Sequence, residues 1–178
     1  MKSITLLRHA KSSWDDPVDR DFDRPLNAKG RRAAETMGRH IRQQGWTYDA
    51  IVASPAVRVL ETLDGVEAGL GRKLPAQLDK RIYMAAGVTL LDIVHEQDHG
   101  ADRLLMIGHN PGLEDLIFLL TPADNNPHRQ AIDIKYPTAT LCEMQFDVES
   151  WEDVSGKIGE IVELVRPRDL DAELGPEG

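Results

Sequence analysis

Ile4-Thr5-Leu6-Leu7-Arg8-His9 is an apolar run that ends in an arginine and a histidine. Aliphatic and β-branched residues in a run of this length predict a buried strand. Open α/β sheets bind ligands just beyond the carboxyl ends of their strands, which is where Arg8 and His9 follow. A guanidinium beside an imidazole indicates a phosphate site in which the histidine acts as a nucleophile or as an acid/base. Alone the pair is weak support, because a histidine after a strand is more often a structural hydrogen-bonding residue.

A second predicted strand ends in the same way. The aliphatic run Arg103–Ile107 leads to Gly108-His109-Asn110, and Pro111 then begins an amphipathic stretch. Proline suits the first turn of a helix because the N–H that it lacks would be unpaired there. We therefore expect His109 to lie near helix N-terminal amides, which favour an anion.

A third junction supplies another arginine. The short apolar run Ala50–Ala53 ends at Ser54, which we expect to be the N-cap of a helix that has Pro55 at its first position. Arg58 then lies in the first turns of this helix. Taken singly, Arg58 fits a solvent-exposed helix face equally well. The three junctions together predict one phosphate site, made of Arg8, His9, Arg58 and His109.

The chain alternates between strands and helices, which is typical of βαβ units. Strands are predicted at residues 3–7, 50–53, 74–78, 103–107, 139–146 and 160–165. Helices are predicted at residues 28–44, 55–70, 87–99 and 111–120. This pattern predicts a three-layer α/β/α sandwich with a mostly parallel sheet and, because no clear helix separates the last two strands, one antiparallel edge. Residues 1–167 form a single predicted domain, and we expect the acidic tail 168–178 to be mobile.

Composition excludes several classes of function. The 178 residues carry a formal net charge of −9, which argues against nucleic acid or an acidic membrane as a partner. Cys142 is the one cysteine, so no internal disulfide is expected, and the scattered histidines lack the spacing of a metal site. We expect no metal and no cofactor. No signal peptide or membrane span is predicted, so the expected location is the cytoplasm.

Three motifs resemble those of the histidine phosphatase superfamily, which also contains the cofactor-dependent phosphoglycerate mutases. They are Arg8-His9-Ala10, Ser54-Pro55-Ala56-x-Arg58-x-x-Glu61-Thr62 and Gly108-His109-Asn110. The stretches 7–14 and 23–30 resemble more narrowly the SixA-type phosphohistidine phosphatases, in which alanine after the catalytic histidine is usual. The resemblance covers about residues 1–120. It implies a phosphoglycerate mutase-like fold, with His9 as nucleophile and His109 as a second histidine that contacts the phosphoryl oxygens.

The chemistry is consistent with this resemblance. Phosphoryl transfer needs a nucleophile, positive charge on the transferring oxygens and a proton for a poor leaving group. A neutral imidazole can form a phosphohistidine that water later cleaves, while Arg8 and Arg58 neutralise the oxygens. Further candidates for substrate binding follow the two histidines: Lys11, Ser12 and Asn110. A turn-stabilising role is the alternative for Ser12.

The general acid is the main departure from the mutase-like branch. That branch carries a glutamate after the third strand, whereas residues 79–87 contain none, as in SixA-type members. Phosphohistidine has a labile P–N bond and an imidazole leaving group that can already carry its proton, so a site without a strong acid favours it over sugar phosphates. Four carboxyl groups on the loop after His9 could still donate a proton: Asp16, Asp19, Asp21 and Asp23. The alternative is that this acidic loop is only a solvated rim.

The sequence therefore predicts a metal-independent phosphatase that works through a phosphohistidine intermediate. The expected substrate is phosphohistidine on a signalling protein, such as a phosphotransfer domain of a bacterial two-component relay. Without a cap insertion the crevice should be open, which suits a phosphate carried by a protein. A small-molecule or generic phosphomonoester phosphatase is the variant within this class. A non-catalytic phosphate- or phosphohistidine-binding module is the alternative from another class, although a pure binder would need only the arginines.

Overall fold

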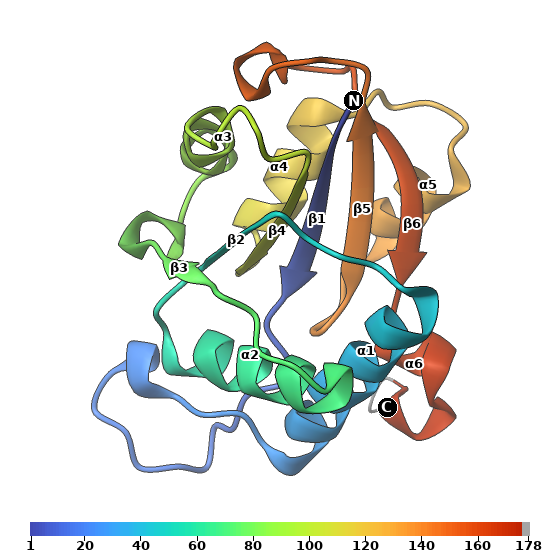
Figure 1. The fold of residues 1–178 in the computed structure, drawn as a ribbon. Coiled ribbons are helices and arrows are strands. Elements are labelled where there is room, and N and C mark those ends of the chain that lie inside the picture. The colour runs from blue at the N-terminus through green and yellow to red at the C-terminus, as the bar shows by residue number, and fades with distance from the viewer. Residues whose placement is uncertain (176–178) are drawn as a thin grey trace.

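A six-stranded sheet forms the centre of the computed structural model, which describes residues 1–175 (Figure 1). The strand order is β3-β2-β4-β1-β5-β6. The strands are β1 (Lys2–Arg8), β2 (Ala50–Ala53), β3 (Gln77–Leu78), β4 (Arg103–Gly108), β5 (Leu141–Phe146) and β6 (Glu160–Val165). β1 to β4 run parallel, and β5 pairs antiparallel with both β1 and β6. The predicted fold class is confirmed.

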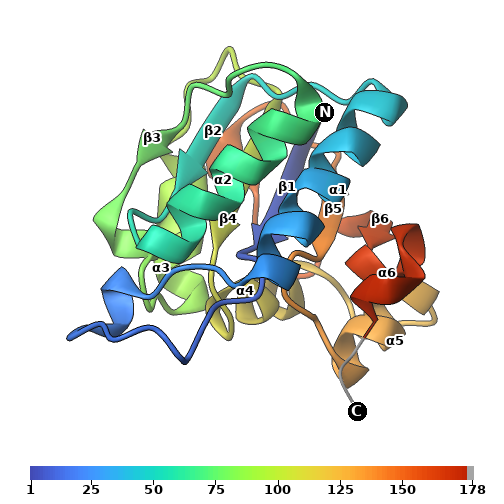
Figure 2. The same cartoon turned by 90° about the horizontal axis from the view of Figure 1, so that it is seen from below.

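Helices cover both faces of the sheet. They are α1 (Ala28–Gln44), α2 (Val57–Leu70), α3 (Gly87–His95), α4 (Gly112–Leu120), α5 (Pro127–Ile134) and α6 (Pro167–Leu170). Short 3-10 turns lie at η1 (Asp21–Asp23), η2 (Lys80–Ile82), η3 (Trp151–Asp153) and η4 (Ala172–Leu174). Figure 2 shows α1 and α2 on one side of the sheet, and α3, α4 and α5 on the other.

The two central strands divide their side chains between these layers. Leu6 and Met106, which are register partners, belong to the core that also contains residues of α3, α4 and α5. Leu7 and Ile107, the next pair, belong to the core beneath α1 and α2. Alternate residues of a strand point to opposite faces, so two apolar layers bury β1 and β4 from both sides. The ends of these strands are therefore rigidly placed.

α1 packs against the segment that follows β1. Asn27 caps this helix, because its side-chain oxygen accepts a hydrogen bond from the Gly30 N–H at 2.7 Å. A Cβ built on Gly30 would lie 2.0 Å from the carbonyl oxygen of Lys11, so only glycine permits this approach. The start of α1 thus braces the residues immediately after His9.

Some details differ from the expectations. Residues 127–134 form α5, for which no element was predicted; Asn126 caps it and Pro127 begins it. α2 begins at Val57 with Ala56 at its N-cap, so the prediction that Ser54 caps this helix is wrong. α3 ends at His95, four residues early. None of the helices in residues 1–175 combines the length and the apolar character needed to cross a bilayer.

Residues 168–175 belong to the segment that we expected to be a mobile tail. The structure gives them helical turns, and Arg32 of α1 forms an ion pair with Asp171 at 2.6 Å. Lys29 donates a hydrogen bond to the carbonyl oxygen of Gly175 at 2.7 Å. The remainder of the tail, residues 176–178, lies outside the described residues. Mobility itself stays a prediction.

Candidate active site

Three junctions meet at the carboxyl edge of the parallel strands, which faces the viewer in Figure 2. β1 ends at Arg8, directly opposite Gly108 of β4, so His9 and His109 leave neighbouring strands at the same level. Their ring centroids lie 5.3 Å apart. Arg58 lies at the same edge, in the first turn of α2. The four residues predicted for the phosphate site all line one cavity: Arg8, His9, Arg58 and His109. Both imidazoles and Arg58 are buried.

Hydrogen bonds of the main chain fix the loop that carries His9. The His9 N–H donates to the carbonyl oxygen of Gly108 at 3.0 Å. The next residue, Ala10, donates its N–H to the hydroxyl of Thr62 at 2.9 Å. Thr62 donates in turn to the carbonyl oxygen of Arg58 at 2.6 Å. One buried hydroxyl on α2 therefore joins the histidine loop to the helix turn that carries the arginine.

His9 has the geometry and the charge state of a nucleophile. Its Nδ1 lies 2.7 Å from the carbonyl oxygen of Ala10. Because a carbonyl only accepts, Nδ1 carries the proton and Nε2 keeps the lone pair. Burial lowers the pKa of His9 to about 3; the hydrogen bond to Ala10 opposes this shift, and the charges of His109 and the two arginines add to it. The imidazole is therefore neutral at physiological pH.

Ser54 and Tyr83 hold the second histidine. The Nε2 atom of His109 lies 2.8 Å from the Ser54 hydroxyl, which is fully buried. The Tyr83 ring packs edge-on against the His109 ring, with centroids 5.3 Å apart. Burial, and then the charge of Arg58, lower the pKa of His109 to about 4, so this imidazole is also neutral at pH 7. Ser54 thus orients a site histidine instead of capping α2.

The two arginines have donors without a protein partner. Arg8 donates from Nη1 to the carbonyl oxygen of Tyr136 at 2.9 Å. Arg58 donates to Asp21, to its carbonyl oxygen at 2.9 Å and to its carboxylate at 3.0 Å. The buried Nε atoms of both arginines, and the buried Nδ1 of His109, find no hydrogen-bond partner within residues 1–175. Buried polar groups normally have one, so three such atoms around one cavity indicate a place for a polar ligand.

Asp21 is the acidic-loop residue that reaches this site. Its carboxylate accepts hydrogen bonds from Tyr83 at 2.7 Å and from Arg24 at 3.0 Å, besides the ion pair with Arg58. Partial burial acts to raise the pKa of Asp21, but these hydrogen bonds and the charge of Arg58 outweigh it and lower the pKa to about 2. Asp21 is therefore an anion at neutral pH and not a ready proton donor. Asp16, Asp19 and Asp23 are not among the residues that line the cavity.

All seven residues predicted for the site line the same cavity, whose volume is about 650 Å³. Asn110 contributes there, although its side-chain amide also donates to Glu114 at 3.2 Å and to the Tyr136 carbonyl oxygen at 3.1 Å. Ser12 is buried and pairs with Leu26 through an isolated bridge, and Lys11 is half-buried. Further cations that we did not predict also line the cavity: Arg24, Lys29, Lys135, Arg166 and Arg168.

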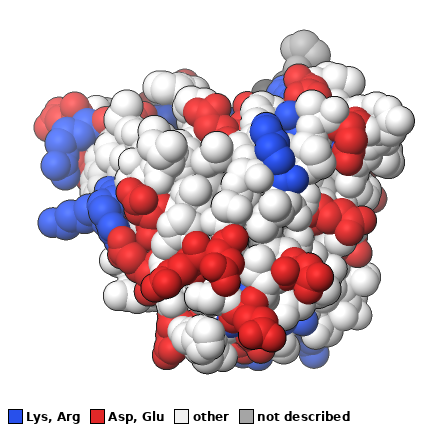
Figure 3. Space-filling view, turned by 90° about the horizontal axis from the view of Figure 1, so that it is seen from above, with Lys and Arg blue, Asp and Glu red and all other residues white. Residues whose placement is uncertain are grey.

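The charges of the protein are unevenly distributed. Figure 3 shows the face opposite to that of Figure 2, where carboxylates gather over the centre and lower part. The cavity, by contrast, has no Asp or Glu among the described residues that line it. An acidic protein that concentrates cations in one cavity has a local site for an anion.

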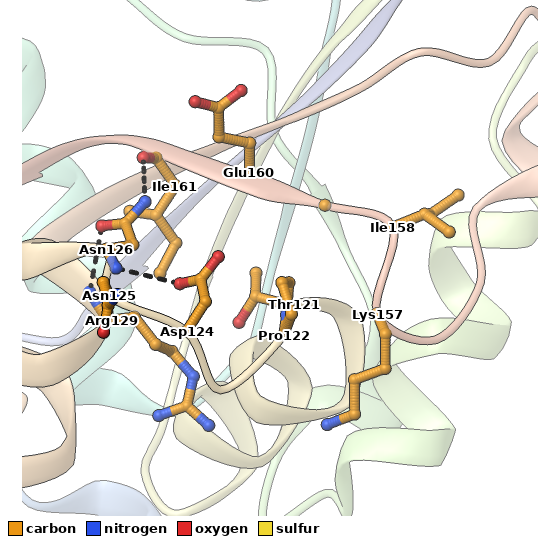
Figure 4. A pocket seen from close by; sticks show the side chains of 11 residues that line it. Thr121, Pro122, Asp124, Asn125, Asn126, Arg129, Lys157, Ile158, Glu160 and Ile161 are labelled. Atoms are coloured by element: carbon orange, nitrogen blue, oxygen red, sulfur yellow. Dashed lines mark hydrogen bonds between the residues drawn. The ribbon is translucent and has the colours of Figure 1, made fainter.

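A second cavity, of about 640 Å³, lies between the end of α4, α5 and the start of β6 (Figure 4). Two of its cations have partners: Arg129 forms an ion pair with Asp133, and Lys157 donates to the carbonyl oxygen of Phe118. Carboxylates of Asp124 and Glu160 also line it. Within residues 1–175, no cluster of three His, Cys, Asp or Glu side chains could hold a metal ion.

Comparison with known proteins defines the class. The family model of the histidine phosphatase superfamily (branch 1) matches residues 4–83. An uncharacterized protein of Mycobacterium tuberculosis is 30% identical over 164 residues, which cover 91% of this chain and 100% of that protein. The chain belongs to the histidine phosphatase superfamily. Membership of this family makes it a phosphatase, that is, a hydrolase.

Solved structures show the same fold. A structure assigned to phosphohistidine phosphatase SixA of Nakamurella multipartitia is similar with a TM-score of 0.79 and 22% identity, covering 93% of this chain and 96% of that chain. The protein histidine phosphatase SixA complexed with tungstate is similar with a TM-score of 0.73 and 20% identity, covering 95% of this chain and 99% of that chain.

Proposed function

We propose that this protein hydrolyses the phosphoryl group of a phosphohistidine carried by another protein, such as a phosphotransfer domain of a two-component relay. One observation carries the proposal. His9 is neutral, its Nδ1 is hydrogen-bonded to a carbonyl oxygen, and it lines a cavity together with Arg8, Arg58 and His109. This is the arrangement that a phosphoryl group needs for in-line attack by an imidazole.

The reaction proceeds in two displacements. Nε2 of His9 attacks phosphorus, a P–N bond to His9 forms, and the P–N bond to the substrate imidazole breaks. Phosphorylation of Nε2 leaves a positive charge on the ring, which the Ala10 carbonyl oxygen stabilises through the Nδ1 proton. Water then attacks the phosphorus atom, releases inorganic phosphate and restores the neutral His9. Arg8 and Arg58 neutralise the charge of the transferring oxygens in both steps.

The surroundings of the site support phosphohistidine over a phosphate ester. An alkoxide leaving group requires a proton donor, because phosphate monoester hydrolysis is among the slowest uncatalysed reactions. No carboxyl group is among the described residues that line the cavity, and Asp21 beside it is ionised. A phosphohistidine leaves as an imidazole that already carries its proton. The SixA structure with tungstate, a tetrahedral oxyanion, adds support from a protein of the same fold.

The test compares three phospho-donors: a phosphohistidine peptide, phosphoramidate and p-nitrophenyl phosphate. We expect the wild type to hydrolyse the phosphohistidine peptide with the highest kcat/KM. His9→Gln should lose turnover of all three while it still binds vanadate, because the arginines remain. A phosphoenzyme trapped on the wild type should be labile in acid and stable in base, as expected for a phosphorylated imidazole.

Each alternative has its own outcome. A strong preference for p-nitrophenyl phosphate over phosphohistidine would indicate a generic phosphomonoesterase. Tight binding of phosphohistidine without turnover by the wild type would indicate a binding module. Hydrolysis by His9→Gln at the rate of the wild type would remove His9 from the role of nucleophile.

A further inference from the structure

The cavity extends well beyond the catalytic residues, to a wall formed by the end of α5, α6 and the start of α1. We propose that this distal wall binds the carboxylates of an acidic segment next to the phosphorylated histidine of a protein substrate. The inference rests on the proposed function and deepens it by naming the kind of surface that the site recognises. The distal wall consists of four cations: Lys29, Lys135, Arg166 and Arg168.

The first argument is charge. Nineteen described residues line the cavity; eight of them are Lys or Arg, and none is Asp or Glu. The whole chain has 21 Lys and Arg against 30 Asp and Glu, so the cavity reverses the sign of the protein around it. One phosphoryl group carries at most two negative charges, which the catalytic arginines already face. The distal cations therefore fit further negative groups on the same substrate.

The second argument is the availability of these cations. Arg166 is held by Asp169 at 2.9 Å, and Lys29 donates to the carbonyl oxygen of Gly175. Lys135 and Arg168 are exposed, and the side chain of neither forms a hydrogen bond or an ion pair within the described part of the chain. Long exposed side chains at the rim of a cavity are suited to meet carboxylates on an approaching protein surface.

The third argument is exposed apolar surface in the cavity and next to Lys135 in the sequence. Trp14 lines the cavity with its side chain 79% exposed, and the guanidinium of Arg24 stacks on its ring at 3.8 Å. Ile134, which precedes Lys135, is 88% exposed. Aromatic residues and arginine are enriched at protein interfaces, and here Trp14 and Arg24 stack on each other in the wall of the cavity. The occupant is therefore a protein segment and not a small polyanion.

The experiment uses two phosphohistidine peptides that differ only in their flanking residues, Asp and Glu in one and Asn and Gln in the other. We expect the wild type to hydrolyse the acidic peptide with a kcat/KM about tenfold higher at low salt, and this preference to shrink as ionic strength rises. The double variant Lys135→Glu/Arg168→Glu should lose the preference and hydrolyse phosphoramidate at the wild-type rate. The double variant Arg72→Glu/Lys73→Glu, the same charge change beyond the far end of α2, is the matched control and should keep the preference.

Binding is measured separately, with the same two peptides carrying phosphoryl-triazolylalanine, a stable analogue of phosphohistidine. If the acidic analogue binds more tightly but the wild type does not hydrolyse phosphohistidine, the proposed function fails and this inference stands. Equal kcat/KM for the two phosphohistidine peptides would overturn the inference. The inference would also fail if the double variant lost as much kcat/KM for phosphoramidate as for the acidic peptide. It would fail too if the double variant impaired hydrolysis of a sugar bisphosphate more than hydrolysis of the acidic peptide.

Discussion

Acidification should leave the two site histidines uncharged long after an ordinary histidine has been protonated. Burial lowers the pKa of His9 to about 3, against 6.5 for the free side chain. At pH 5 an ordinary histidine is about 97% protonated, whereas His9 would be about 1% protonated. The hydrogen bond to Ala10 also predicts that the neutral ring carries its proton on Nδ1.

Long-range ¹H–¹⁵N correlation spectra of the imidazoles measure both properties. Spectra are recorded from pH 8 to pH 4.5, and the spectrum of His9→Gln assigns the His9 signals. We expect His9 to keep a protonated Nδ1 and an unprotonated Nε2 throughout, while a histidine-containing peptide in the same sample titrates normally. A titration midpoint of His9 near 6.5, or a proton on Nε2 at pH 7, would refute the reasoning on which the nucleophile assignment rests.

The same shifts make stability depend on pH. The folded-state pKa values of His9 and His109, about 3 and about 4, lie below the unfolded value of 6.5. The unfolded chain therefore binds more protons below pH 6.5, and the free energy of unfolding falls as the pH falls from 6.5 toward 4. Between pH 6 and pH 5 each histidine should account for about 1 kcal/mol. Urea unfolding at the two pH values should show that His9→Gln removes about 1 kcal/mol of this difference; an unchanged difference would contradict the buried, neutral state.

Three further predictions concern the supports of the site. Arg58→Ala should weaken inhibition by vanadate at least about tenfold, because it removes a charged multidentate donor; an unchanged inhibition constant would place this arginine outside the phosphate site. Ser54→Ala should lower kcat and destabilise the fold by about 1–3 kcal/mol, since Nε2 of His109 loses a buried partner at 2.8 Å; urea unfolding and kcat without any loss would show that this contact is dispensable. Gly30→Ala should cost about 1–3 kcal/mol and reduce kcat, because its Cβ would lie 2.0 Å from the main chain just after His9. Gly100→Ala is its control, since the nearest atom to a Cβ built there is 3.8 Å away, and equal thermal stability of the two variants would show that the close approach does not matter.

The sequence predicts the position of the candidate site residues because they follow apolar runs that form buried strands. Parallel strands end at a common edge, so two such runs in one parallel sheet place His9 and His109 at the same side of the sheet. Arg58 joins them because its helix follows a third parallel strand. No packing detail is needed for this part of the prediction.

Other parts of the site depend on contacts that no local pattern records. The residue type and position of Ser54 favour a helix cap, yet its hydroxyl lies against His109, which is 55 residues away. Tyr83 reaches the same histidine from the turn after β3. The distal cations come from α1, the end of α5 and α6, and only the packing of α6 on α1 brings them to one cavity. The net charge of the sequence therefore indicates an acidic protein and gives no sign of the distal cations in the cavity.

The central position of β1 has a consequence for biosynthesis. His9 is synthesised before residues 103–108 and 141–146, from which β1 takes its neighbours in the sheet. A nascent chain therefore cannot assemble the surroundings of His9 until residues 141–146 have been translated, since pairing over such separations must wait for both partners. If His9 is the nucleophile that we propose, translation products that stop before residues 141–146 should therefore show no phosphatase activity.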